Sequence, residues 1–167
     1  MGTDKLRFVG KVQDGASGFR RLQLPGCSGD CQLVPDWPED LYRGSLNVQI
    51  DTNGYPKKFV EVFGDTQMRN LDSRKFLPAA ELDYDVIPNN SLPPERNRPP
   101  DRGRPQIWRA TLRNLATGDT ALCWVLRRRH STMRQDTLEC VAGVRLRDAL
   151  TLETGDAVEL VVEGTWA

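Results

Sequence analysis

Ser45 and Asn47 are the residues of this sequence whose types and spacing most suggest chemistry. They lie in the segment Gly44-Ser-Leu-Asn-Val-Gln-Ile50, in which polar and aliphatic residues alternate. Residues two apart in a β-strand face the same way, about 6.5–7 Å apart, so both side chains would project from one face. Neutral oxygens alone hold Mg²⁺ poorly, because the ion takes much of its coordination from carboxylate, phosphate and water. A metal here therefore needs an anionic partner such as a nucleotide phosphate; the alternative is an ordinary polar strand face in water.

The glycine-rich turn Gly15-Ala16-Ser17-Gly18 is a second candidate site. Glycine allows backbone N–H groups to approach a phosphate closely, so Gly15, Ser17 and Gly18 are candidate nucleotide-binding residues. The segment is not a Walker loop, because no Gly-Lys-Ser/Thr follows it. A plain hairpin turn is the alternative.

Charged side chains in the second half of the chain supply further candidates. Arg129 and His130, the only histidine, end a basic run that either clamps a phosphate or forms a solvated strand end. Glu139 lies between Leu138 and Cys140 in an apolar strand pattern, so its carboxylate faces solvent or the mouth of a cavity. At a cavity mouth it would serve as a general base or accept a hydrogen bond from a substrate. An exposed strand position is the alternative for Glu139.

The four cysteines favour free thiols over a metal site. Cys27 and Cys31 lie in a loop-like stretch, whereas Cys123 and Cys140 lie in apolar strand patterns typical of small buried residues. A structural zinc site needs four Cys or His ligands in close pairs, and only His130 offers another loop-type ligand. Free thiols are therefore the favoured interpretation.

Length and composition limit the class of protein. A chain of 167 residues with 38% hydrophobic residues is long enough for one globular domain with a core. The 23 Lys and Arg residues balance 23 Asp and Glu residues, which argues against nucleic-acid binding through bulk charge. No apolar run approaches the roughly 18 residues of a membrane helix. The first residues lack the apolar core of a signal peptide, so we expect a cytoplasmic location and no membrane partner.

Short strand patterns dominate the chain and predict a β-barrel or sandwich. Alternation predicts strands at 5–13, 19–24, 45–50, 55–63, 82–88, 107–115, 120–129, 137–143 and 157–163. Turn signals lie at 15–18, 51–54, 116–119 and 154–156, the best short helix is 144–150, and a helical turn fits 38–43. A regular alternation of strands with amphipathic helices is absent, so a Rossmann sheet is not expected.

One segment, 89–106, interrupts the strand pattern. It is rich in proline and arginine and has almost no apolar residue, so it buries too little surface to offset the entropy of ordering. Strand patterns resume on both sides of it, and the chain has no internal repeat. We therefore expect a single domain over 1–167 with a flexible insertion at 89–106.

In their order along the chain, these motifs resemble the archaeal CTP-dependent riboflavin kinases. The resemblance covers 8–51, with "GKVQDGASGFRRLQL" and "GSLNVQI", and about 127–163, with "RRRH" and "TLECVAGVRLRDALTLETGDAVEL". In that family the threonine and asparagine of a Gly-Thr-Leu-Asn motif bind the Mg²⁺ of the nucleotide, and the matching residues here are Ser45 and Asn47. The implied fold is mainly β: a six-stranded cradle-loop (riboflavin-kinase-like) barrel with one or two short helices, besides the Pro/Arg-rich insertion.

The resemblance also implies an activity, the transfer of a phosphoryl group from CTP to riboflavin to give FMN. Mg²⁺ would be the cofactor, CTP and riboflavin the small-molecule partners, and Glu139 would orient or deprotonate the attacking hydroxyl. The nucleotide-binding residues would be Gly15, Ser17, Gly18, Arg129 and His130.

The sequence departs from the family pattern in several places, and two other functions stay open. The glycine turn is one residue shorter, Ala142-Gly143 replaces Ala-Pro, and the spacing from His130 to Glu139 is longer. One alternative is a barrel that binds a flavin or nucleotide without catalysis. The other is an interaction module whose Arg-rich segment, 94–113, binds an acidic partner.

Overall fold

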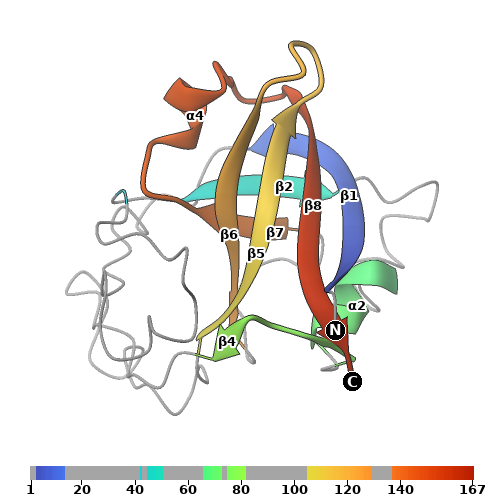
Figure 1. The fold of residues 1–167 in the computed structure, drawn as a ribbon. Helices are drawn as coiled ribbons and strands as arrows, with labels where there is room; N and C mark the ends of the chain where they lie inside the picture. Colours follow the sequence, from blue (N-terminus) through green and yellow to red (C-terminus); the bar gives the residue numbers. More distant parts are fainter. Residues whose placement is uncertain are drawn as a thin grey trace, which may run out of the picture.

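The strands close into a barrel (Figure 1). The computed structural model describes residues 3–13, 42, 45–50, 66–72, 75–81, 105–128 and 137–167. Six antiparallel strands follow one another around the ring, and the last pairs with the first: β1 (Asp4–Gln13), β2 (Leu46–Ile50), β7 (Thr137–Val141), β6 (Thr120–Arg128), β5 (Pro105–Asn114) and β8 (Ala157–Trp166). The prediction of a mainly β, six-stranded barrel is confirmed.

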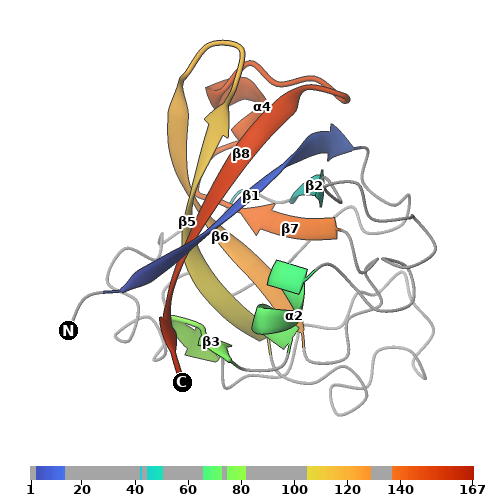
Figure 2. The same cartoon turned by 90° about the vertical axis from the view of Figure 1, so that its right-hand side faces the viewer.

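Two short strands and two short helices flank the ring. β3 (Phe76–Leu77) pairs with β8, and β4 (Ala80–Glu81) pairs with β5. α4 (Leu146–Ala149) and α2 (Thr66–Asp72) lie toward opposite ends of the barrel (Figure 2). In the part of the chain that the structure describes, no helix is long and apolar enough to cross a membrane.

Alternation of apolar residues accounts for the barrel core. Val12, Val48 and Leu138 are register partners on three neighbouring strands and are almost completely buried. Met68 of α2 and Leu146 of α4 belong to the same hydrophobic cluster. Each helix therefore contributes apolar side chains to the core near one end of the barrel, which removes that surface from water.

Two glycines are required by the local geometry. A Cβ atom on Gly10 of β1 would overlap the backbone oxygen of Gln49 on β2, so glycine permits the close approach of these strands. Gly118 has a φ of 80° in the connection between β5 and β6, a conformation that favours glycine. The hairpin predicted from the turn signal at 116–119 is thus confirmed.

Most predicted elements within the described residues are confirmed, with small shifts at their ends. The strands predicted at 5–13, 45–50, 107–115, 120–129, 137–143 and 157–163 correspond to β1, β2, β5, β6, β7 and β8, and α4 falls inside 144–150. β5 begins at Pro105, so the last two residues assigned to the 89–106 insertion belong to a strand instead. The rest of the insertion and the strands predicted at 19–24, 55–63 and 82–88 lie outside the described residues, as does the turn at 38–43 apart from Tyr42.

Candidate functional site

Polar residues on three neighbouring strands lie in register on the outer side of the barrel. Asn47 of β2 is the partner of Gln13 on β1 and of Glu139 on β7. The residues that alternate with them belong to the hydrophobic core, so these three side chains share the outer face. Side chains at such positions have Cβ atoms roughly 4.5–5.5 Å apart. We call Gln13, Asn47 and Glu139 the outer polar row.

Asn47 is buried although it lies on the outer side of the barrel. The residue is only 8% exposed, whereas a solvated strand face would leave it open to water. Its Oδ1 atom has no hydrogen-bond partner among the residues that the structure describes. An unsatisfied buried acceptor costs about 1–3 kcal/mol, which a bound cation or donor would offset. The alternative of an ordinary polar face in water is therefore wrong for Asn47.

Ser45 and Glu139 are the other predicted site residues near Asn47, the first in the chain and the second across the strand pair. Ser45 is half-buried directly before β2, and Glu139 is half-buried on β7 opposite Asn47. A hydroxyl, an amide oxygen and a carboxylate are ligands that Mg²⁺ accepts, so these residue types are compatible with the implied cation. In the described ranges, no group of three or more His, Cys, Asp and Glu residues could hold a metal. A cation at this set would therefore depend on a phosphate for further negative charge.

Gln13 and Thr137 extend the polar contacts beyond the predicted site. Gln13 Nε2 donates to Thr137 Oγ1 over 3.3 Å, and Thr137 is itself only 1% exposed. The buried Arg127 of β6 donates from Nη1 to the backbone oxygen of Thr137 over 3.1 Å. These contacts could not be predicted from the sequence, because they depend on how distant strands pair. The sequence offers one signal for Gln13: the alternation of residues 5–13 places its side chain on the face of the strand that points away from the core.

The other predicted site residues lie outside the described part of the chain. They are Gly15, Ser17, Gly18, Arg129 and His130. Their contact with a nucleotide stays a prediction from the sequence. The structure therefore brings together Asn47 and Glu139, with Ser45 two residues along the chain from Asn47.

The two described cysteines are interior residues, as their strand patterns predicted. Cys123 of β6 and Cys140 of β7 are both free and fully buried. A hydrogen bond with Cys123, together with burial, raises the pKa of the Cys140 thiol well above its usual value. This thiol is therefore protonated and unreactive at neutral pH. Cys27 and Cys31 lie outside the described residues.

Two comparisons with known proteins were without a match. No protein-family model matches this chain, and no curated protein matches it. The interpretation of the site therefore depends on the motifs of the sequence and on the placement of Asn47 and Glu139.

Proposed function

We propose that this protein transfers a phosphoryl group from a nucleotide, CTP, to riboflavin and releases FMN. The observation that carries the proposal is the buried Oδ1 atom of Asn47, which lacks a partner among the described residues and lies in register with Glu139. Asn47 also occupies the position at which the riboflavin-kinase motif has its Mg²⁺ ligand. A cytoplasmic location belongs to the same proposal.

Ser45 and Asn47 would hold Mg²⁺ through their side-chain oxygens. When bound, the ion supplies positive charge against the phosphates of the nucleotide, which is a major part of catalysis in phosphoryl transfer. Asn47 lies in a strand that is paired on both sides, so its oxygen is held in place before a ligand arrives. The candidates for the remaining nucleotide contacts are those from the sequence: Gly15, Ser17, Gly18, Arg129 and His130.

Glu139 would orient the attacking hydroxyl of riboflavin and accept its proton. The hydroxyl oxygen forms a bond to the γ-phosphorus, the bond from that phosphorus to the β,γ-bridging oxygen breaks, and CDP leaves. The half-burial of Glu139 suits this role, because the residue is the register partner of Asn47 and is not completely buried. General base catalysis of this kind contributes roughly 10²–10⁴-fold to a rate.

Incubation of the protein with riboflavin, Mg²⁺ and each of the four nucleoside triphosphates tests the proposal. We expect FMN to form with CTP and not when EDTA removes Mg²⁺. Glu139→Gln should lower kcat about a hundredfold while CTP still binds. Binding of CTP or riboflavin without any FMN would overturn the kinase proposal in favour of a non-catalytic binding barrel.

A further inference from the structure

Lys11 of β1 lies on the outer side of the barrel, two residues before Gln13 of the outer polar row. Its register partner on β2 is Gln49, which follows Asn47 by two residues on the same face. Lys11 is therefore the diagonal neighbour of Asn47, and Cβ atoms in that relation lie roughly 7–8 Å apart. A long side chain spans this distance, so the ammonium of Lys11 can reach a ligand that is bound at Asn47.

The backbone around Lys11 is held closely against its neighbours. A Cβ atom on Gly10, the residue before it, would lie only 2.2 Å from the backbone oxygen of Gln49, so β1 and β2 approach each other tightly at this point. The N–H of Val12, the residue after it, donates to the backbone oxygen of Asp156 over 3.0 Å. The strand position from which Lys11 projects is therefore fixed relative to β2 before any ligand arrives, which lowers the entropic cost of binding.

The charge of Lys11 is unpaired within the described part of the chain. The residue is exposed, and its ammonium forms neither an ion pair nor a hydrogen bond with any residue that the structure describes. Two arginines on the same outer side differ from it: Arg7 pairs with Glu159, and Arg109 pairs with Glu163 over 2.8 Å. An anion that binds Lys11 would therefore have no described carboxylate to displace.

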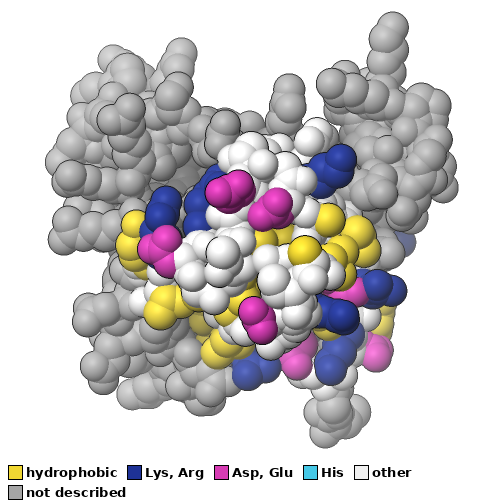
Figure 3. All heavy atoms as spheres, turned by 90° about the horizontal axis from the view of Figure 1, so that it is seen from above, with side chains coloured by type: hydrophobic (Ala, Val, Ile, Leu, Met, Phe, Trp, Pro, Cys, Tyr) yellow, Lys and Arg dark blue, Asp and Glu magenta, His cyan; other side chains and the backbone are white. Residues whose placement is uncertain are grey.

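The outer polar row itself carries no positive charge. Gln13 and Asn47 are neutral, and Glu139 contributes a carboxylate. A nucleoside triphosphate keeps negative charge after it binds one Mg²⁺, so phosphates at this row would need a cation beside them. Acidic and basic side chains are mixed on the end of the barrel that carries α4 (Figure 3), so a general positive field does not supply that charge.

We infer that Lys11 binds the phosphates of the nucleotide whose Mg²⁺ is held at Asn47. The inference rests on the proposed function and adds to it a phosphate-binding residue on β1. It combines two independent observations: the unpaired ammonium of Lys11 and, diagonal to it, the buried Oδ1 of Asn47 without a described partner. A lysine ammonium suits phosphate oxygens, because it is a compact point charge with three N–H donors.

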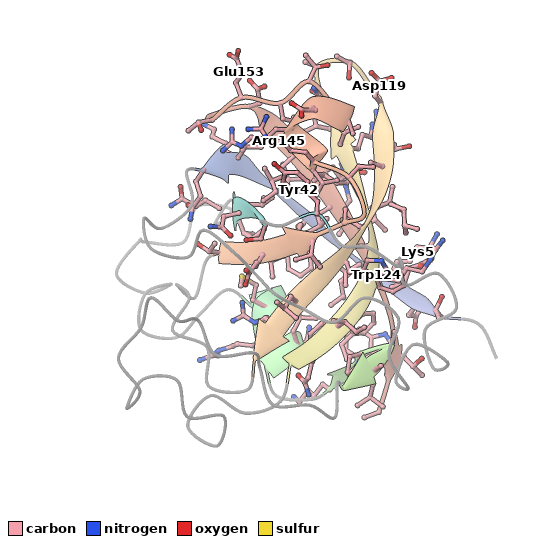
Figure 4. The ribbon with its side chains drawn as sticks, turned by 90° about the vertical axis from the view of Figure 1, so that its left-hand side faces the viewer. Lys5, Tyr42, Asp119, Trp124, Arg145 and Glu153 are labelled. Atoms are coloured by element: carbon pink, nitrogen blue, oxygen red, sulfur yellow. The ribbon has the colours of Figure 1, made fainter. Side chains whose placement is uncertain are left out.

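Lys5 offers a matched control on the same strand. It is exposed and lies on the same outer side of β1, six residues before Lys11, which corresponds to about 20 Å of strand. Figure 4 shows Lys5 far from Arg145 and Glu153, which lie at the opposite end of the barrel. Lys5→Gln therefore removes the same charge as Lys11→Gln, but far from Asn47.

Inorganic tripolyphosphate with Mg²⁺ is the direct probe, because it has the phosphates without the base or sugar. Calorimetric titrations would compare the wild type with Lys11→Gln, Lys11→Arg and Lys5→Gln. We expect Lys11→Gln to weaken the binding of tripolyphosphate and of CTP at least tenfold and to leave the Tm unchanged, because the exposed side chain has no described partner to lose. Lys11→Arg should recover part of the affinity because it keeps the charge, and Lys5→Gln should bind both ligands like the wild type.

The outcomes separate this inference from the proposed function. If the wild type and Lys11→Gln bind tripolyphosphate equally, or if Lys5→Gln weakens binding as much as Lys11→Gln, the inference is overturned, and FMN formation from CTP would still support the function. Conversely, binding of tripolyphosphate that depends on Lys11, without any FMN formation, supports the anion site and contradicts the kinase. Loss of binding in both Lys11 variants, together with a Tm lowered by several degrees, would make Lys11 a structural residue only and overturn the inference.

Discussion

Two buried asparagines of this barrel, Asn47 and Asn114, lie in opposite environments. Asn114, the last residue of β5, is 3% exposed; its Nδ2 donates to the backbone oxygen of Leu150 over 2.8 Å, and its Oδ1 accepts from the N–H of Ala116 over 3.0 Å. The Oδ1 of Asn47 is equally hidden but has no partner among the described residues. Buried polar groups are normally satisfied, so each exception requires an explanation. The contrast places Asn114 among the residues that hold the fold together, whereas under the proposed function the burial of Asn47 would serve a ligand.

The surroundings of Asn114 support this division. Its backbone N–H donates to the oxygen of Asp119 over 3.0 Å, and its backbone oxygen accepts from the N–H of Gly118 over 2.7 Å. The end of the β5–β6 hairpin thus satisfies its own polar groups. In the outer polar row, by contrast, the Oδ1 atom of Asn47 has no hydrogen-bond partner among the described residues. Unsatisfied polar groups of this kind are expected at functional sites.

Substitution of Asn114 should have the largest effect on stability. Asn114→Leu leaves the oxygen of Leu150 and the N–H of Ala116 without their partner, at about 1–3 kcal/mol for each unsatisfied group. We expect the free energy of unfolding, measured in urea, to fall by roughly 2–4 kcal/mol. A decrease of less than about 0.5 kcal/mol, the usual range for neutral surface substitutions, would contradict the claim that the buried Asn114 stabilises the fold.

The buried thiol of Cys140, on the inward side of β7, should make the stability of the protein depend on pH. Cys140 follows Glu139 but lies in the core, where the hydrogen bond with Cys123 and burial raise the pKa of its thiol. The folded protein then holds this proton more tightly than the unfolded chain, so the stabilisation is complete below the unfolded pKa and declines as the pH rises toward the folded pKa.

Above about pH 8.5, we therefore expect the free energy of unfolding to decrease by up to about 1.4 kcal/mol per pH unit. Urea unfolding at neutral and alkaline pH measures this decrease, and Cys140→Val should reduce it. If the free energy of unfolding of Cys140→Val decreases with pH as steeply as that of the wild type, another group is responsible for the alkaline dependence.

Substitution of Asn47 should have the smallest effect on the stability of the ligand-free protein. Asn47→Leu nearly keeps the side-chain volume and removes a buried oxygen without a described partner, so stability should stay unchanged or rise by up to about 1 kcal/mol. Thermal and urea unfolding of Asn47→Leu and Asn114→Leu, measured side by side, compare the stabilities of the two variants. A loss as large as that of Asn114→Leu would mean that Asn47 is satisfied within the fold.

The sequence predicted the barrel strands well because their inward residues are apolar at period two. Val12, Val48 and Leu138 show this pattern in strands far apart along the chain. The same signal could not locate α2, which spans seven residues, or β3 and β4, which span two residues each. A strand of two residues contains too few positions for a periodic pattern to emerge, and α2 has only Met68 and Leu71 as apolar residues.

The candidate site was predictable only in part. The spacing of Ser45 and Asn47 pointed to a metal, and the strand pattern around Glu139 pointed to a carboxylate at a surface or cavity mouth. That Glu139 and Gln13 lie on either side of Asn47 depends on which strands pair around the ring, and local patterns do not determine that pairing. The burial of Asn47 and the place of Lys11 diagonal to it are likewise tertiary features.

Calorimetric titration of CTP with and without Mg²⁺, on the wild type, Asn47→Leu and Ser45→Ala, tests the central claim most directly. In Asn47→Leu the Mg²⁺-dependent affinity should fall at least tenfold, about 1.4 kcal/mol, while Mg²⁺-independent binding changes little. Ser45→Ala should show a milder loss, because water can replace one hydroxyl ligand, and the two losses should not add, because both residues serve one ion. The account is contradicted if both variants bind CTP–Mg²⁺ like the wild type, or if the wild type binds no nucleotide.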